Sequence, residues 1–251
     1  MSHHVLILGG TGEAVALAQA LAGSRPELAV TTSLAGATSA PVRPPGHLRT
    51  GGFGGADGLA AWLAEARVDA LVDATHPFAA TMAGHAAGAA ATVGIPRLKL
   101  VRPMWQRRDG DRWIGVADAA AAAGALATLA ARRVFLTLGS RDLQAFAGLK
   151  GTTFTVRMIE PPAEPLPLVR ADLILARGPF GEAGEGALMA SRRIDAVVAK
   201  ASGGEATRGK IDAARALGLP VVMIARPPLP QGPVATDVAA AMAWIDETLP
   251  A

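Results

Sequence analysis

The sequence predicts an α/β protein built on parallel β-sheets. Short runs rich in Val, Ile and Leu alternate with longer Ala-rich segments, which is the pattern of consecutive strand–helix units. A glycine turn, which is typical of such units, directly follows the first apolar run. The length of 251 residues with 51% hydrophobic residues allows one large domain or two smaller domains that share a cleft.

The predicted elements follow one another as strand and helix along most of the chain. Strands are expected at 4–8, 28–33, 69–73, 97–101, 133–138, 172–175, 195–199 and 220–224. Helices are expected at 12–22, 56–66, 79–92, 118–131, 182–191, 207–217 and 235–248. Residues 102–111 break the alternation with Pro, Gly and clustered charge, so we expect a first domain at 1–101 and a second at 102–251.

The first strand leads into a candidate phosphate-binding turn. Glycines let the backbone approach a pyrophosphate, and the N–H groups of the next helix's first turn can donate to it. The strict G-x-G-x-x-G spacing is not met because position 15 is Val, so a turn that serves only packing is the alternative. The predicted cofactor contacts are Gly9, Gly10, Thr11, Gly12 and Glu13.

The end of the second strand indicates which nucleotide binds. NAD sites carry an acidic residue there that accepts the ribose hydroxyls, whereas this strand ends in Thr31, Thr32 and Ser33. Hydroxyls without a carboxylate tolerate a 2′-phosphate, so Thr32 and Ser33 favour NADP. No Arg lies in this turn, and Arg43 is a possible partner of unknown position. The alternative is that these residues simply favour a strand.

Two further segments of the first half are candidate cofactor contacts. The stretch 47–55 is rich in glycine and either wraps the cofactor at Gly52 or serves as a plain connection. Thr75 and His76 follow the strand at 69–73, so they lie at the carboxyl edge of the sheet, where doubly wound folds bind ligands. Pro77 fits the first position of a helix, so Thr75 and His76 could instead cap that helix.

In the second half, a cation follows each of four predicted strands. Residues 1–100 hold six Lys/Arg and six Asp/Glu, whereas residues 101–251 hold eighteen and fifteen. The cations at the strand ends are Arg141, Arg177, Lys200 and Arg226. A ligand with several carboxylates would explain this row, and the alternative is ordinary polar loop residues.

The loop after Lys200 is the most distinctive one in the second half. Gly203 and Gly204 can form a nest of N–H groups for a carboxylate, with Ser202 or Thr207 as the cap of the following helix. The loop is not a Walker A motif, because Ile211 stands where that motif requires Ser or Thr.

Composition excludes several classes of function. Without Cys there are no disulfides or thiolate nucleophiles, and without Tyr a Tyr–Lys reductase dyad is impossible. No metal site is expected. A net charge of +3 is too small for a nucleic-acid footprint.

No signal peptide or span of membrane length is found, so we expect a cytoplasmic protein. The sequence is compatible with a monomer but does not determine the oligomeric state.

Several motifs together resemble those of the precorrin-6A reductase family. They occur in the same order, from about residue 5 to Pro227. The segments are I-L-G-G-T-G-E from Ile7, D-A-T-H-P-F-A from Asp73, L-G-S-R from Leu138, A-R-G-P-F from Ala176 and K-A-S-G-G from Lys200.

The resemblance implies two Rossmann-like parallel-sheet domains around a central cleft. It further implies reduction of one double bond of precorrin-6A by NADPH, giving precorrin-6B in cobalamin biosynthesis. The acetate and propionate arms of this anionic tetrapyrrole would meet the cations of the second half. The implied substrate residues are Ser140, Arg141, Arg177, Lys200, Ser202, Gly203, Gly204 and Arg226.

The proton that accompanies the reduction leaves alternatives open. His76 and Lys200 are candidate catalytic donors by position and chemistry, and delivery by water is equally compatible with the sequence. Two other functions are also compatible. One is a cobalt-precorrin-6A reductase, which differs in acting on a cobalt-loaded substrate, and the other is a non-enzymatic NADP-sensing protein.

Overall fold

The computed structural model describes residues 3–36 and 43–250 and divides the chain into two compact units. Unit 1 comprises the residues up to Pro103 together with those from Pro227 onward, and unit 2 comprises Met104–Arg226. The first boundary lies close to the expected one at residue 101. The expected second domain, 102–251, differs from unit 2 because its last segment belongs to unit 1.

The last segment joins unit 1 through hydrogen bonds and packing. β12 (Val234–Ala235) pairs in parallel with β5 (Arg97–Leu100). α8 (Val238–Thr248) packs beside α1 (Gly12–Ser24), with Ala241 and Ile245 fully buried in the same core. Burying one large aliphatic side chain stabilises a fold by about 1.5–3 kcal/mol, which anchors the segment here. Local periodicity predicts α8 as a helix but does not identify its packing partner.

Unit 1 contains a six-stranded parallel sheet in the order β3-β2-β1-β4-β5-β12. The remaining strands are β1 (His4–Leu8), β2 (Ala29–Leu34), β3 (His47–Thr50) and β4 (Ala70–Asp73). The remaining helices are α2 (Ala56–Glu65) and α3 (Ala80–Val93). The strand order reverses between β1 and β4, and open α/β sheets bind ligands at such a switch point.

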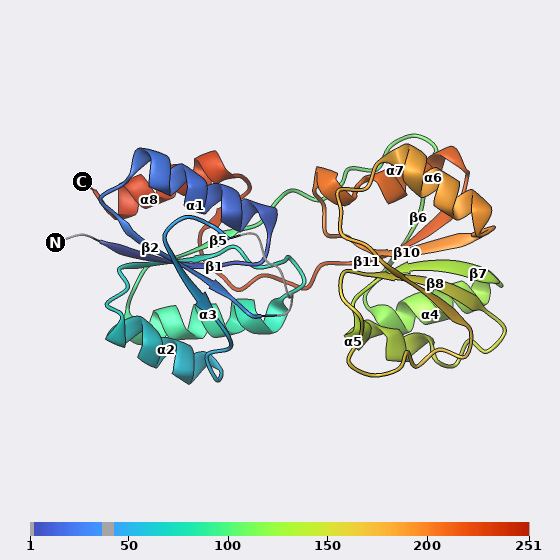
Figure 1. Ribbon diagram of the computed structural model, residues 1–251, viewed down its shortest axis with the longest axis horizontal. Coiled ribbons are helices and arrows are strands. Elements are labelled where there is room, and N and C mark those ends of the chain that lie inside the picture. Colours follow the sequence, from blue (N-terminus) through green and yellow to red (C-terminus); the bar gives the residue numbers. More distant parts are fainter. Residues whose placement is uncertain (1–2, 37–42, 251) are drawn as a thin grey trace. The chain divides into compact units, whose positions relative to one another are not determined.

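The two faces of this sheet follow from the alternation of side chains along β1. Val5 and Ile7 are buried in the core that α1 and α8 cover. Leu6 and Leu8 point to the other face and are buried against α2 and α3. Figure 1 shows these two helix pairs on opposite sides of the sheet.

Unit 2 repeats this architecture with a parallel sheet in the order β9-β8-β7-β10-β11-β6. Its strands are β6 (Arg112–Val116), β7 (Arg133–Thr137), β8 (Thr153–Met158), β9 (Ala171–Leu175), β10 (Ala196–Lys200) and β11 (Pro220–Ile224). Its helices are α4 (Ala119–Thr128), α5 (Ser140–Leu143), α6 (Glu182–Ser191) and α7 (Gly209–Ala216), with 3-10 turns at Gln144–Phe146 and Glu205–Thr207. Figure 1 shows α6 and α7 on one face of the sheet and α4 on the other, and the switch point lies between β7 and β10.

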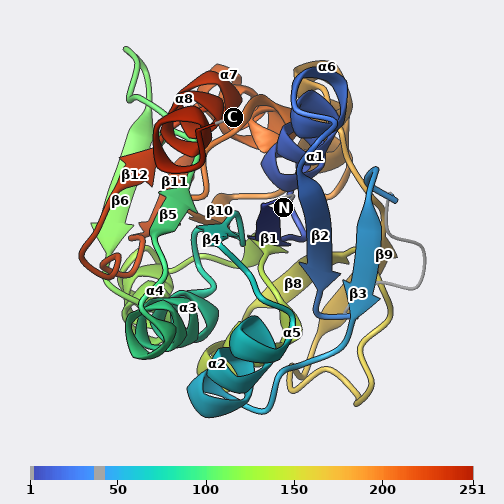
Figure 2. The same ribbon diagram turned by 90° about the vertical axis from the view of Figure 1, so that its left-hand side faces the viewer.

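Four strands were not predicted, namely β3, β6, β8 and β12. β8 carries Arg157 as its penultimate residue, and arginine is a residue type that is mostly exposed. In the structure its guanidinium is buried, with Nη2 2.9 Å from Glu185 Oε2 and its plane 3.6 Å from the centre of the Phe180 ring. β3 is a short, mostly exposed strand beside β2 at the edge of its sheet, visible in Figure 2. Its polar sequence lacks the apolar run of a buried strand.

Among residues 3–36 and 43–250, no helix combines the length and the apolar character needed to cross a bilayer.

Candidate functional site

The three glycines after β1 have different structural roles. A Cβ atom on Gly9 would lie 3.0 Å from side-chain atoms of Thr32 and Leu34, so Gly9 is needed for packing. Gly10 has φ +108°, a conformation that favours glycine. Gly12 is the first residue of α1 and is exposed, and no atom lies within 4 Å of its Cβ position. The predicted turn therefore leaves open space at the N-terminus of α1.

Thr11 joins this turn to the segment after β4. Its hydroxyl accepts from the N–H of Ala14 at 3.2 Å, which caps α1, and donates to the carbonyl of Ala74 at 2.7 Å. The two predicted cofactor segments therefore meet at the switch point of the unit 1 sheet. Glu13, also a predicted contact, has its carboxylate 3.0 Å from Nη1 of Arg102.

Thr75 is held by a buried ion pair rather than serving as a helix cap. The ammonium of Lys99 lies 3.0 Å from Oδ1 of Asp73, and the two side chains are 1% and 0% exposed. The same carboxylate oxygen accepts the Thr75 hydroxyl at 2.6 Å and its N–H at 3.0 Å. The expectation that Pro77 starts the helix is wrong, because α3 begins at Ala80 and its N-cap has no side-chain hydrogen bond.

His76 is exposed at the same edge of unit 1. Its Nδ1 accepts from the N–H of Phe78 at 3.2 Å. In a neutral imidazole this bond assigns the ring proton to Nε2. His76 does not cap α3, and its role as a proton donor stays a prediction.

The second strand places Thr32 beneath the turn and Ser33, which is 5% exposed, beside Arg49. Thr32 is 1% exposed and lies against Gly9, so packing is its visible role. The Ser33 hydroxyl accepts from Nη1 of Arg49 at 3.2 Å. Sequence reasoning missed Arg49 because β3, which brings it beside β2, was interpreted as loop. The signal was the basic residue two positions before Gly51-Gly52. Arg43 is exposed.

The four cations of unit 2 do lie at the carboxyl ends of parallel strands, but they are engaged differently. Arg141 is exposed, and Arg177 lies 3.7 Å from Glu160. Lys200 is 2.6 Å from Oδ2 of Asp142, across the switch point between β10 and β7. Ser140 begins α5 at this edge and is exposed.

Arg226 has a structural role. Its Nε donates to the carbonyl of Ala201 at 2.7 Å, and its Nη2 donates to that of Ser202 at 2.9 Å. These bonds hold the start of the K-A-S-G-G loop. A guanidinium engaged with main-chain oxygens has fewer donors left for a carboxylate.

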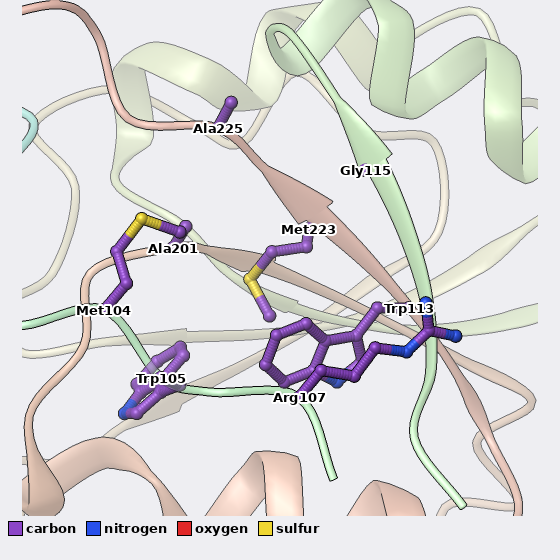
Figure 3. A pocket seen from close by; sticks show the side chains of 8 residues that line it. All are labelled: Met104, Trp105, Arg107, Trp113, Gly115, Ala201, Met223 and Ala225. Atoms are coloured by element: carbon purple, nitrogen blue, oxygen red, sulfur yellow. The ribbon is translucent and has the colours of Figure 1, made fainter. Parts of the chain in front are cut away.

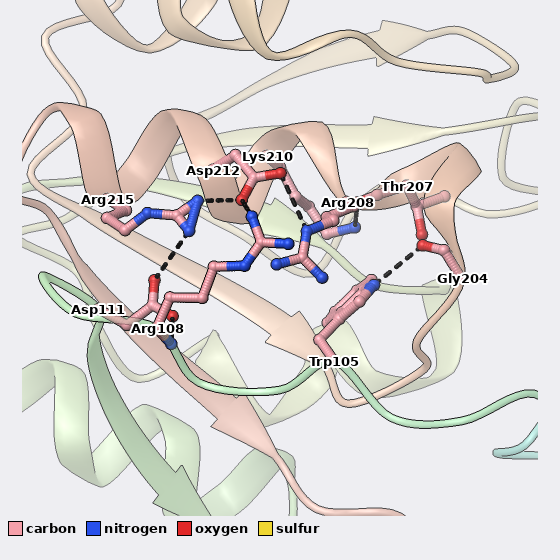
Figure 4. A network of polar contacts seen from close by, with 9 residues as sticks. All are labelled: Trp105, Arg108, Asp111, Gly204, Thr207, Arg208, Lys210, Asp212 and Arg215. Atoms are coloured by element: carbon pink, nitrogen blue, oxygen red, sulfur yellow. Dashed lines mark hydrogen bonds and ion pairs between the residues drawn. The ribbon is translucent and has the colours of Figure 1, made fainter.

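The rest of this loop is fixed from a distant part of the chain, as Figure 4 shows. The indole Nε1 of Trp105 donates to the carbonyl of Gly204 at 2.9 Å. Lys210 donates to the carbonyl of Thr207 at 2.7 Å and lies 4.9 Å from the centre of a Trp105 ring. The expected capping by Ser202 or Thr207 is wrong, because the N-cap of α7 is Arg208 and makes no side-chain cap bond. Gly203 and Gly204 have φ +65° and +83°.

An apolar pocket of about 290 Å³ lies beside this loop in unit 2 (Figure 3). The lining is dominated by two indoles and two thioethers, with one guanidinium. The lining residues are Met104, Trp105, Arg107, Trp113, Gly115, Ala201, Met223 and Ala225. Two of them directly adjoin strand-end cations, since Ala201 follows Lys200 and Ala225 precedes Arg226. Sequence reasoning missed this pocket because its residues come from four separate segments.

Comparison with known proteins gives consistent matches over nearly the whole chain. Residues 4–246 match the family described as Precorrin-6x reductase CbiJ/CobK. The chain is 52% identical to a precorrin-6A reductase of Rhodococcus erythropolis and 47% identical to one of Mycobacterium tuberculosis, each over 96% of both chains. A solved structure of CobK precorrin-6A reductase matches with a TM-score of 0.92 and 41% identity, covering 98% of this chain and 97% of the other.

Proposed function

The chain belongs to the precorrin-6x reductase family and is an oxidoreductase of cobalamin biosynthesis, and from this premise we propose that it reduces one double bond of precorrin-6A with NADPH, giving precorrin-6B. Membership identifies an enzyme rather than the non-enzymatic NADP-sensing protein that the sequence left open. The observation that carries the choice of a nucleotide cofactor is the open glycine turn at the switch point of unit 1.

The residues of this turn fit a dinucleotide. The space at Gly10 and Gly12 leaves room for a pyrophosphate beside the N–H groups of the first turn of α1. The end of β2 carries the Ser33 hydroxyl and no carboxylate, which suits a 2′-phosphate. When bound, NADPH supplies a hydride to the macrocycle. Thr75, His76 and Gly52 line the same carboxyl edge of the sheet as candidate contacts.

Unit 2 offers the complementary chemistry for a carboxylated macrocycle. We assign the acetate and propionate arms to Arg141, Arg177 and Lys200, with the N–H groups of Gly203 and Gly204 as further donors. The apolar pocket in Figure 3 would accept the edge of one pyrrole-derived ring, because its wall is formed by indole and thioether groups. Ser140 and Ser202 complete the proposed substrate residues, and Arg226 supports them by holding the loop.

The proton has two candidate donors among the chain's own residues. His76 presents its Nε2, and Lys200 presents an ammonium whose position is fixed by Asp142. Delivery through water is the third route. If Lys200 only anchors a carboxylate, its removal raises KM and leaves kcat unchanged, whereas loss of a proton donor lowers kcat at saturating substrate.

The test follows NADPH oxidation with metal-free precorrin-6A, with the cobalt-loaded compound as the comparison. We expect turnover of the metal-free substrate, and its absence would refute the proposed reaction. Turnover of the cobalt-loaded compound alone would instead identify a cobalt-precorrin-6A reductase. Lys200→Met and His76→Gln are then compared at saturating substrate. A drop of about 100-fold or more in kcat for one of them identifies the proton donor.

A further inference from the structure

Arg49 occupies a place that matters for cofactor choice in doubly wound folds. β3 pairs with β2 so that Arg49 stands opposite Ser33, and Nη1 of Arg49 donates to the Ser33 hydroxyl at 3.2 Å. The end of the second strand is where such folds meet the 2′-position of the adenosine ribose. The guanidinium therefore lies beside the residue that we assign to that ribose.

The local structure holds this guanidinium in one position. Nη1 also donates to the carbonyl of Gly51 at 2.6 Å, and Nη2 donates to that of Gly52 at 2.7 Å. One face of the guanidinium lies over the Phe53 ring at 3.7 Å, and that ring packs edge-on against Trp62 at 5.6 Å. Because the side chain is already ordered, an incoming anion immobilises little further rotamer freedom.

The positive charge of Arg49 is not balanced by an acidic residue. Within the described residues, no carboxylate lies within ion-pair distance of it, and residues 37–42 contain no Asp or Glu. The three bonds named above use three of the five guanidinium N–H groups, which leaves Nε–H and one N–H of Nη2 as donors for an anion.

We propose that Arg49, fixed between Ser33 and the Gly51-Gly52 carbonyls, binds the 2′-phosphate of NADPH and is the residue that selects NADPH over NADH. This inference rests on the proposed use of NADPH. Arg49 is thus the arginine that is missing from the sequence of the turn directly after β2. The competing role is purely structural, with Arg49 only clamping the glycine-rich loop through the two carbonyls.

The experiment measures dissociation constants of the full-length protein by isothermal titration calorimetry for two adenosine probes. The probes are adenosine 2′,5′-bisphosphate and 5′-AMP, which differ only in the 2′-phosphate. Variants are Arg49→Gln, which removes the charge, and Arg49→Lys, which keeps the charge without the planar fork. Arg67→Gln is the matched control, since Arg67 is an exposed arginine of unit 1 that precedes β4 rather than following a strand. Arg43→Gln tests the rival cation.

If Arg49 binds the 2′-phosphate, Arg49→Gln weakens the bisphosphate about 10- to 100-fold, as expected for charge-assisted hydrogen bonds, and leaves 5′-AMP within about twofold. Arg49→Lys gives an intermediate loss, and Arg67→Gln gives none. NADPH and NADH titrations of the same proteins should show the same ratio. A circular dichroism melt of each variant confirms that the fold is retained.

Three results would overturn the inference. Equal weakening of both probes by Arg49→Gln identifies a loop clamp. If Arg49→Gln keeps the preference for the bisphosphate over 5′-AMP, or if Arg43→Gln loses it instead, the 2′-phosphate binds elsewhere. The proposed use of NADPH would still stand in that case. If the unmodified protein binds both probes equally, the proposed NADPH preference itself fails, and the role of Arg49 fails with it.

Discussion

Replacing Asp73 with Asn should strongly destabilise unit 1. The substitution keeps the size of the side chain and an oxygen that can accept from Thr75, but it removes the charge that pairs with Lys99. Both partners are almost fully buried, at 0% and 1% exposure. Removing one partner of a buried pair leaves an uncompensated charge and costs about 3–5 kcal/mol.

The matched control is Asp246→Asn in the same unit. Oδ1 of Asp246 lies 2.5 Å from Nη1 of Arg25, closer than the 3.0 Å of the buried pair, but the Asp246 side chain is 54% exposed. An exposed ion pair is screened by water and contributes little to stability. Burial rather than distance therefore predicts which variant is damaged.

The assay is urea denaturation followed by circular dichroism, with hydrogen exchange of β1 and α1 peptides to report on unit 1 separately. At about 2–4 °C per kcal/mol, Asp73→Asn should also lower Tm by about 6–20 °C. The double variant with Lys99→Met should recover part of the loss, because the unpaired ammonium is gone. Equal losses for Asp73→Asn and Asp246→Asn, within about 0.5 kcal/mol, would refute the reasoning.

Three further predictions concern the ligands. Ser33→Asp should weaken NADPH binding by about 1–4 kcal/mol, because the new carboxylate would repel the 2′-phosphate. This range is the repulsion between two unit charges about 4 Å apart, from screening as in water to screening as at a protein surface. An unchanged dissociation constant in calorimetry would contradict this prediction. Gly12→Val should abolish NADPH binding, because the added side chain would occupy the space proposed for the pyrophosphate at the N-terminus of α1. Its Tm should be unchanged, because the position is open and its φ is not positive. Normal NADPH binding by this variant would mean that the turn serves packing alone. Arg141→Ala should raise the KM for the macrocycle by about 10- to 100-fold without loss of stability. Arg226→Ala should instead lower Tm, because the loop at Ala201 and Ser202 would lose the bonds that hold it. The reverse pattern would exchange the roles of the two arginines.

The sequence was sufficient for the elements with a strong local signal. The β1 run and the Ala-rich periodicity of α1 are buried on the faces that their patterns predict. The N-cap of α1 at Thr11 also follows from local chemistry. Local signals failed where a neighbour distant in the chain determines the conformation. The buried position of Arg157 in β8 is an example, because Glu185 and Phe180 neutralise and cover its guanidinium.

The candidate site shows the same division. The motif residues, and their placement after parallel strands, could be read from the chain because every strand in a parallel sheet ends at the same edge. The sequence does not show which of the unit 2 cations remain available to a ligand. In the structure, Lys200 pairs with Asp142, and Arg226 donates to two main-chain carbonyls. Hydrogen bonds of this kind depend on contacts between segments far apart in sequence.

The α/β class, the glycine turn and the family could be predicted from the amino-acid sequence, because they depend on local periodicity and short contiguous motifs. Three features required the folded structure: the chain from Pro227 returns to unit 1, Lys99 is buried next to Thr75, and Arg49 lies beside Ser33. The pairing of β3 with β2 is the physical reason for the last of these. It brings together two residues that lie sixteen positions apart, and no local pattern specifies that register.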